Sequence, residues 1–117
     1  MRVRATGPAG HGSRFVERPA VDKLVGVASR MLAFREAQKC AYEAGCACGR
    51  TLGDFTTVNV TSLRAGVPGS GGVDAYNVVP TGAEAGVNIR VPVTSDLPAF
   101  MRQLDEWTTV DAVSEAG

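Results

Sequence analysis

The sequence lacks an excess of either charge, long apolar runs and a signal-like N-terminus. Twelve basic and twelve acidic residues leave the formal net charge at zero. Because nucleic-acid binding needs a clustered basic surface, this balance argues against a DNA or RNA partner. No apolar run is long enough to span a membrane, and no apolar stretch follows the basic first residues as it would in a secretory signal. We therefore expect a cytoplasmic protein.

Cysteine and histidine are too few to build a disulfide framework or a metal centre. Three cysteines, Cys40, Cys46 and Cys48, form an odd and closely spaced set that is not typical of paired disulfides. A zinc site would need a fourth ligand, and the lone histidine, His11, lies far away in the sequence. We expect reduced, incidental thiols and no metal held by this chain.

The lone histidine lies in a glycine-rich turn. Residues 7–15 read GPAGHGSRF, and three glycines and a proline within six residues cannot continue a helix or a strand. The turn should connect a short strand at Met1–Thr6 to a helix that begins at Pro19. Because functional side chains concentrate in such loops, His11 is a candidate functional residue. The alternative is a solvated side chain without a role.

Two stretches have the period of amphipathic helices. The first runs from Pro19 to about Cys40, and Asp22 adds a negative charge to its first turn. The second follows Thr94–Asp96, whose side-chain oxygens can cap it. The predicted core stripes are Val21, Leu24, Val25, Ala28, Met31 and Leu32 in the first helix, and Leu97, Phe100, Met101, Leu104 and Trp107 in the second.

Two further stretches are typical of strands. β-Branched residues fill Phe55–Arg64, and apolar and polar residues alternate from Ala83 to Val93, where Arg90 points away from the core. Between them, Ala65–Gly72 is a glycine-rich loop that lacks the lysine and helix start of a phosphate-binding loop. Residues 110–117 are small and polar, and we expect a fraying tail there.

These elements follow the order strand, helix, strand, strand, helix. The order predicts an α+β domain with the split βαβ plan of a ferredoxin-like fold, in which an antiparallel sheet carries both helices on one face. The last strand of that plan is missing from the prediction, so the first strand would be left as an open edge. With 117 residues the chain is expected to form a single domain.

Several motifs, taken in order, resemble a known family. They are VRATGPAGHGSRFVE, MLAFRE, FTTVNVTSLRAG, AYNVVPTGAEAGVNIRV and DLPAFMRQLDEW. Over about residues 3–107 they resemble the inserted dimerisation, or lid, domain of the zinc-dependent aminoacylases and related metallo-carboxypeptidases, nearest to the aminoacylases that hydrolyse N-acyl-L-amino acids. The resemblance implies that residues 1–117 are one domain of a larger enzyme, inactive alone, whose other domain binds two zinc ions.

The resemblance also implies roles for three residues. His11 matches the family's lid histidine, which reaches the zinc site of the partner subunit and stabilises the oxyanion of the tetrahedral intermediate. Asn77 and Arg90 match an asparagine and an arginine that hold the substrate carboxylate. Judged from the residues alone, Asn77 would be a turn residue that hydrogen-bonds the backbone, and Arg90 a solvated residue on a strand face.

A homodimer is a further expectation. The strand at Thr56–Leu63 and the helix that starts at Pro19 should form its interface, because an edge strand leaves N–H and C=O groups that a symmetry mate can pair with. The predicted function is dimerisation and substrate capping in a di-zinc amidohydrolase that cleaves N-acyl-L-amino acids to a carboxylate and a free amino acid. The alternative is a stand-alone ferredoxin-like binding or interaction module without catalytic activity.

Overall fold

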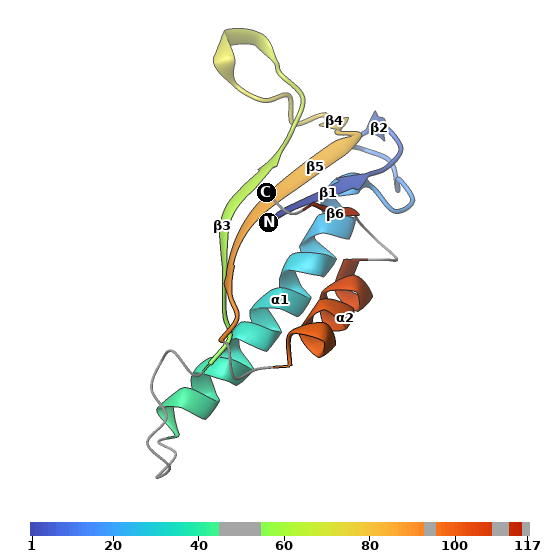
Figure 1. Ribbon diagram of the computed structural model, residues 1–117. Coiled ribbons are helices and arrows are strands. Elements are labelled where there is room, and N and C mark those ends of the chain that lie inside the picture. The colour runs from blue at the N-terminus through green and yellow to red at the C-terminus, as the bar shows by residue number, and fades with distance from the viewer. Residues whose placement is uncertain (45–54, 93–95, 109–112, 116–117) are drawn as a thin grey trace.

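The computed structural model describes residues 1–44, 55–92, 96–108 and 113–115 (Figure 1). The elements in chain order are β1 Arg2–Thr6, β2 Gly10–His11, α1 Ala20–Glu43, β3 Thr57–Ala65, a 3₁₀ turn η2 at Ser70–Gly72, β4 Val78–Val79, β5 Gly82–Arg90, α2 Leu97–Thr108 and β6 Val113–Glu115. This mixture of two helices and an antiparallel sheet confirms the predicted α+β class.

Four strands form the main sheet in the order β3-β5-β1-β6, and every neighbouring pair is antiparallel. Because β1 and β3 are both antiparallel to β5, they run parallel to each other on either side of it. This is the split βαβ arrangement of a ferredoxin-like fold. Both helices cover the same face of the sheet, and none of the described elements covers the other face (Figure 1).

The prediction that the last strand is missing is wrong. Val113–Glu115 forms β6, which pairs with β1 so that Arg2 lies opposite Glu115 and Arg4 opposite Val113. Three residues are too few to display the alternation by which a strand is recognised in a sequence. Because β6 covers one side of β1, the first strand is not an open edge. Among the described strands, the long free edge of the sheet belongs to β3.

The ends of the helices follow local chemistry. Pro19 occupies the N-cap of α1, so the helix begins one residue later than predicted, and Asp22 lies in its first turn. At the start of α2, the Ala99 N–H donates to Asp96 Oδ1 at 3.1 Å, which confirms one of the predicted caps. The other two candidates, Thr94 and Ser95, lie outside the described residues.

The core lies between the sheet and the two helices. Its buried members are Val3, Ala5, Ala20, Leu24, Val27, Met31, Val58, Ala83, Ala85, Val87, Phe100, Leu104 and Trp107. Phe34 of α1 packs against two aromatic rings of α2, with centroid distances of 5.6 Å to Phe100 and 5.3 Å to Trp107. Arg30 also donates a hydrogen bond to the Trp107 carbonyl at 2.8 Å. These contacts hold α2 against α1.

Four residues of the predicted core stripes lie on the surface. Val25 and Leu32 of α1, and Leu97 and Met101 of α2, have exposed fractions between 46% and 54%. Periodicity identifies an apolar side of a helix, but it does not separate the centre of that side from its flanks. The predicted stripes therefore included both core residues and apolar flanks that this domain does not cover.

The thiols and other metal-binding groups of the described residues do not cluster. Cys40 is a free, exposed thiol, whereas Cys46 and Cys48 lie outside the described residues. Within the described ranges no group of three or more His, Cys, Asp or Glu side chains is placed to hold a metal ion. In that same part of the chain, neither helix combines the length and the hydropathy needed to cross a membrane.

Met31 and Met101 provide a matched test of the core. Met31→Ala should lower the free energy of unfolding by about 2–5 kcal/mol, because it opens a cavity in a packed interior. Met101→Ala should change it by less than about 0.5 kcal/mol, because that side chain is half exposed. Urea unfolding followed by the fluorescence of Trp107, the only tryptophan, measures both. Equal losses in the two variants would contradict the described core.

Candidate functional site

The glycine-rich turn joins a second, two-stranded sheet. β2 pairs with β4, so that His11 lies opposite Val78 and Gly10 opposite Val79. One residue further along, the Gly12 N–H donates to the Asn77 carbonyl at 2.8 Å. The structure thus brings together two predicted site residues, His11 and Asn77, from distant parts of the sequence.

Two glycines allow this turn to approach its neighbours closely. A Cβ added at Gly7 would lie 2.6 Å from the Ala20 nitrogen, at the start of α1. A Cβ added at Gly12 would lie 3.3 Å from the Tyr76 carbonyl oxygen. Both neighbours are backbone atoms, so they cannot move aside as the end of a flexible side chain could. The glycines fix the turn between α1 and β4 and thereby position His11.

The His11 side chain contacts Ser13. The Ser13 N–H donates to Nδ1 of the imidazole at 3.2 Å, and Ser13 Oγ lies 2.8 Å from the same nitrogen. The His11 carbonyl accepts a hydrogen bond from the Arg14 N–H at 3.0 Å, which closes a β-turn. Backbone and side chain of His11 are therefore both held, although the residue itself is exposed.

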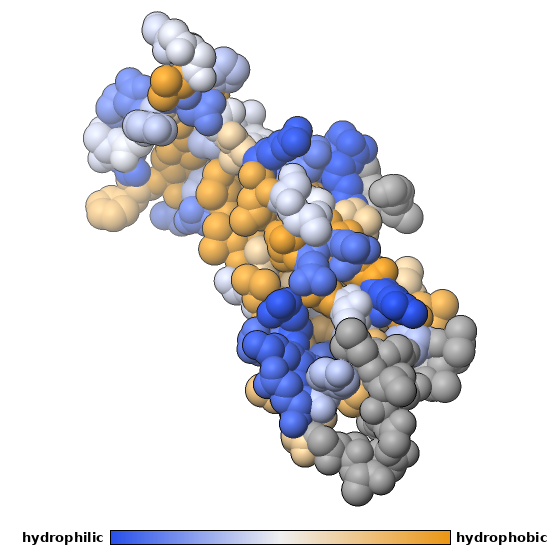
Figure 2. Space-filling model, turned by 90° about the vertical axis from the view of Figure 1, so that its left-hand side faces the viewer, coloured by the Kyte–Doolittle hydropathy of each residue, from blue (hydrophilic) through white to orange (hydrophobic). Residues whose placement is uncertain are grey.

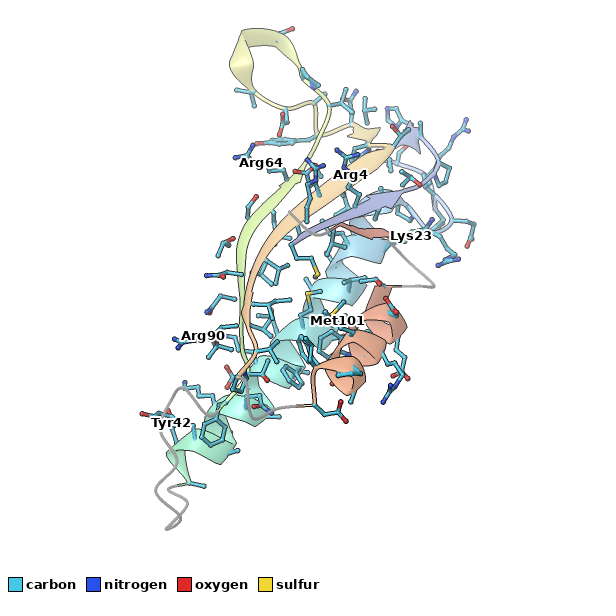
Figure 3. The ribbon with its side chains drawn as sticks, viewed as in Figure 1. Arg4, Lys23, Tyr42, Arg64, Arg90 and Met101 are labelled. Atoms are coloured by element: carbon cyan, nitrogen blue, oxygen red, sulfur yellow. The ribbon has the colours of Figure 1, made fainter. Side chains whose placement is uncertain are left out.

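Arg90 lies at the opposite end of the main sheet. It ends β5 and pairs with Thr57, whereas Gly82 begins β5 close to the turn that carries His11. A nine-residue antiparallel strand spans roughly 27 Å at ~3.4 Å for each of its eight steps. Figure 3 shows the Arg90 side chain pointing away from the helices, as the alternation predicted. Within one protomer, Arg90 and the pair His11 and Asn77 therefore cannot contact the same small molecule.

The uncovered face of the sheet is rich in arginine. Arg4, Arg64 and Arg90 extend from it on three different strands (Figure 3). Arg4 Nε lies 3.6 Å from Glu84 Oε2, and both side chains are partly exposed. In the strand register Glu84 lies opposite both Arg4 and Arg64, so its carboxylate offsets part of the positive charge on this face.

An apolar cavity of the described residues lies away from His11. It measures about 160 Å³ and lies between the C-terminal half of α1 and the start of β3, with Tyr42 and Phe55 in its wall and Arg35 and Lys39 beside them. The two rings pack edge to face with centroids 5.6 Å apart. His11 and Asn77, in contrast, lie on an open surface. A substrate held there would need a second surface to enclose it.

The side of the molecule that carries the free edge of β3 is partly apolar. Arg35 of α1 donates a hydrogen bond to Asn59 of β3 at 3.2 Å, so this flank of the helix borders that strand. Leu32 precedes Arg35 by one helical turn, and Val25 lies two turns before Leu32 on the same flank. Leu63 of β3 is also exposed, at 60%. Figure 2 shows that apolar surface crosses this side of the molecule.

Sequence reasoning did not single out Ser13, Phe15 or Tyr76. Ser13 was read only as part of the turn. Phe15 and Tyr76 are almost fully exposed, and they flank His11 and Asn77 in the sequence. Tyr76 directly precedes Asn77 and Phe15 follows His11 by four residues, so an aromatic residue without helical or strand periodicity near a candidate site residue was the available signal for both.

Comparison with known protein families identifies one kind of domain. Residues 1–115 match the family described as the peptidase dimerisation domain. Aminoacylase-1 of Dictyostelium discoideum is 44% identical over 97% of this chain and 28% of that protein, and aminoacylase-1 of Sus scrofa is 42% identical over 92% of the chain and 24% of that protein. A solved Burkholderia cenocepacia structure, described as an amidohydrolase/peptidase, is 25% identical with a TM-score of 0.46 and covers 90% of this chain and 21% of that one. The chain thus spans about a quarter of the length of the curated relatives.

Gly7 and Gly82 provide a matched test of the turn. Gly7→Ala should lower the free energy of unfolding by about 1–3 kcal/mol, because the new methyl group would meet backbone atoms at the start of α1. Gly82→Ala should change it by less than about 0.5 kcal/mol, because nothing lies within 4 Å of the added Cβ. Denaturant midpoints of the two variants measure the difference. A Gly7→Ala variant with the denaturant midpoint of the wild type would show that the turn does not pack against the helix as described.

Proposed function

Because this chain belongs to the peptidase dimerisation domain family, we propose that it is the dimerisation and lid domain of an aminoacylase-type amidohydrolase. Residues 1–117 would form a single domain of a larger enzyme, since the curated relatives are several times as long. The substrates would be N-acyl-L-amino acids, cleaved to a carboxylate and a free amino acid. The observation that carries the proposal is a free β3 edge beside an exposed apolar flank of α1, in a chain of this family.

Two copies would join through that edge. A two-fold axis beside β3 would pair the strand with its own copy in antiparallel fashion and extend both sheets into one. The same axis would bring Val25 and Leu32 of α1 against the corresponding helix of the partner, which removes apolar surface from water. The strand and the helix of this interface are those expected from the sequence.

This symmetry would resolve the separation of Arg90 from His11 and Asn77. Antiparallel pairing of β3 with its copy places the Arg90 end of one protomer beside the His11 end of the other. The two β5 strands would then be separated by three interstrand spacings, roughly 14 Å, which two side chains and a substrate between them can bridge. Each composite site would take Arg90 from one protomer and His11 with Asn77 from its partner.

The three side chains have distinct tasks in this proposal. Arg90 would hold the substrate carboxylate with its two-pronged guanidinium, and the Asn77 amide would add a hydrogen bond. His11 would donate a hydrogen bond to the oxyanion that forms when the amide carbon is attacked. The described residues offer no cluster of metal-binding side chains, so the zinc ions that would supply the attacking water belong outside this part of the enzyme.

The interface can be tested with paired lysine substitutions. Val25→Lys together with Leu32→Lys should convert dimers to monomers, because it places charge on the apolar flank of α1. Leu97→Lys together with Met101→Lys is the matched control, since these residues are equally exposed but lie on α2. Sedimentation equilibrium measures the oligomeric state. A dimer that survives the first pair, or is lost with the second, would place the interface elsewhere.

The role of His11 can be tested in a chimera in which this chain replaces the matching segment of the Dictyostelium discoideum aminoacylase-1. The unmodified chimera should be active, whereas a stand-alone binding module would leave it inactive. His11→Ala should lower kcat by about 100-fold or more at normal zinc content, the scale of one lost oxyanion donor.

Subunit mixing tests whether His11 acts across the interface. A chimera with only His11→Ala and one disabled only at its zinc ligands should each be nearly inactive. Mixed under conditions of subunit exchange, they should regain activity, because each heterodimer contains one intact composite site. Proven exchange without recovery would show that His11 does not act on the partner's site.

A further inference from the structure

We propose that Ser13 is a positioning residue for His11, which it holds in the tautomer that carries the proton on Nε2. This inference rests on the proposed role of His11 as a hydrogen-bond donor. It goes beyond that role by naming the residue that prepares the donor.

The contacts of Nδ1 determine the tautomer. The Ser13 backbone N–H donates to Nδ1 at 3.2 Å, and a backbone N–H cannot accept a hydrogen bond. This contact favours a lone pair on Nδ1. The Ser13 hydroxyl, 2.8 Å from the same nitrogen, can turn its proton toward that lone pair and reinforce the arrangement. In a neutral imidazole, the remaining proton then resides on Nε2.

The turn brings Ser13 to the ring. The His11 carbonyl accepts from the Arg14 N–H at 3.0 Å, so residues 11–14 form a β-turn with Ser13 at its third position. A side chain at the first position that accepts from the third N–H resembles an Asx-turn, with an imidazole nitrogen in place of the carboxylate or amide oxygen. Gly12, between them, is bound to the Asn77 carbonyl, which ties the turn to β4.

The tautomer determines whether the outward ring nitrogen of His11 can donate a hydrogen bond to an oxyanion. With the proton on Nε2, the outward edge of the ring offers an N–H to a developing oxyanion. With the proton on Nδ1, the outward nitrogen would present a lone pair, which repels the same oxyanion. Ser13 would therefore favour the protonation pattern that the proposed chemistry needs, before a substrate binds.

Because His11 is the only histidine, nitrogen NMR of this chain reads its tautomer directly. At alkaline pH the wild type should show an unprotonated Nδ1 and a protonated Nε2. Ser13→Ala, which keeps the backbone donor but loses the hydroxyl, should increase the Nδ1-protonated form severalfold, and Ser13→Thr should restore the wild-type pattern. Ser70→Ala, an exposed serine in η2, is the control and should change nothing. A protonated Nδ1 in the wild type, or an unchanged tautomer ratio in Ser13→Ala, would overturn the inference.

Kinetics of the same variants in the chimera separate this inference from the proposed function. Ser13→Ala should lower kcat by about tenfold with KM changed by less than about twofold, and Ser13→Thr should recover most of the loss. If His11→Ala leaves kcat unchanged, the proposed function of His11 fails, while the NMR result still judges the tautomer on its own. If His11→Ala is slow but Ser13→Ala keeps the wild-type kcat, Ser13 is not a positioning residue.

Discussion

The length of β5 is the constraint on which the placement of the candidate site residues depends. The strand lies between β1 and β3, so both pairings of its backbone fix its position in the sheet. Its first residue, Gly82, follows closely on β4 and Asn77, and its last residue is Arg90. A continuous strand of this length cannot fold back on itself. Its two ends, and the candidate site residues near them, therefore lie far apart. In the proposed dimer, the second half of each site would come from the partner subunit.

The sequence predicted the parts of this arrangement whose signals are local and long. Alternation along Ala83–Val93 is clear because one side of β5 packs on the helices and the other faces away from them. The turn in GPAGHG was also predicted, but the prediction that no strand runs through it is wrong, because Gly10–His11 forms β2 and pairs with β4. β6 could not be read, because its three residues are held by pairing with β1 rather than by a pattern of their own. Only the folded β1 reveals that an edge is available there.

The apolar flanks show a second limit. Val25 and Leu32 satisfy the helical period as well as Leu24 and Met31 do, yet only the latter pair is buried. A sequence shows that a side chain is apolar, but it does not show whether its own domain or another molecule buries that side chain. Likewise, the motif containing His11 did not reveal which imidazole nitrogen carries the proton. That follows from the contacts of Ser13, which exist only once the turn has closed.

Dimerisation and chemistry would be coupled in this domain through geometry rather than through motion. His11 and Asn77 lie on an open surface at one end of the sheet, and Arg90 lies on the uncovered face at the other end. Neither half encloses a substrate, and water would compete for every hydrogen bond that each half could offer. Pairing β3 with its copy would add no new functional group. It would bring the existing ones into two equivalent sites, so that the strength of the interface sets the fraction of protein able to act.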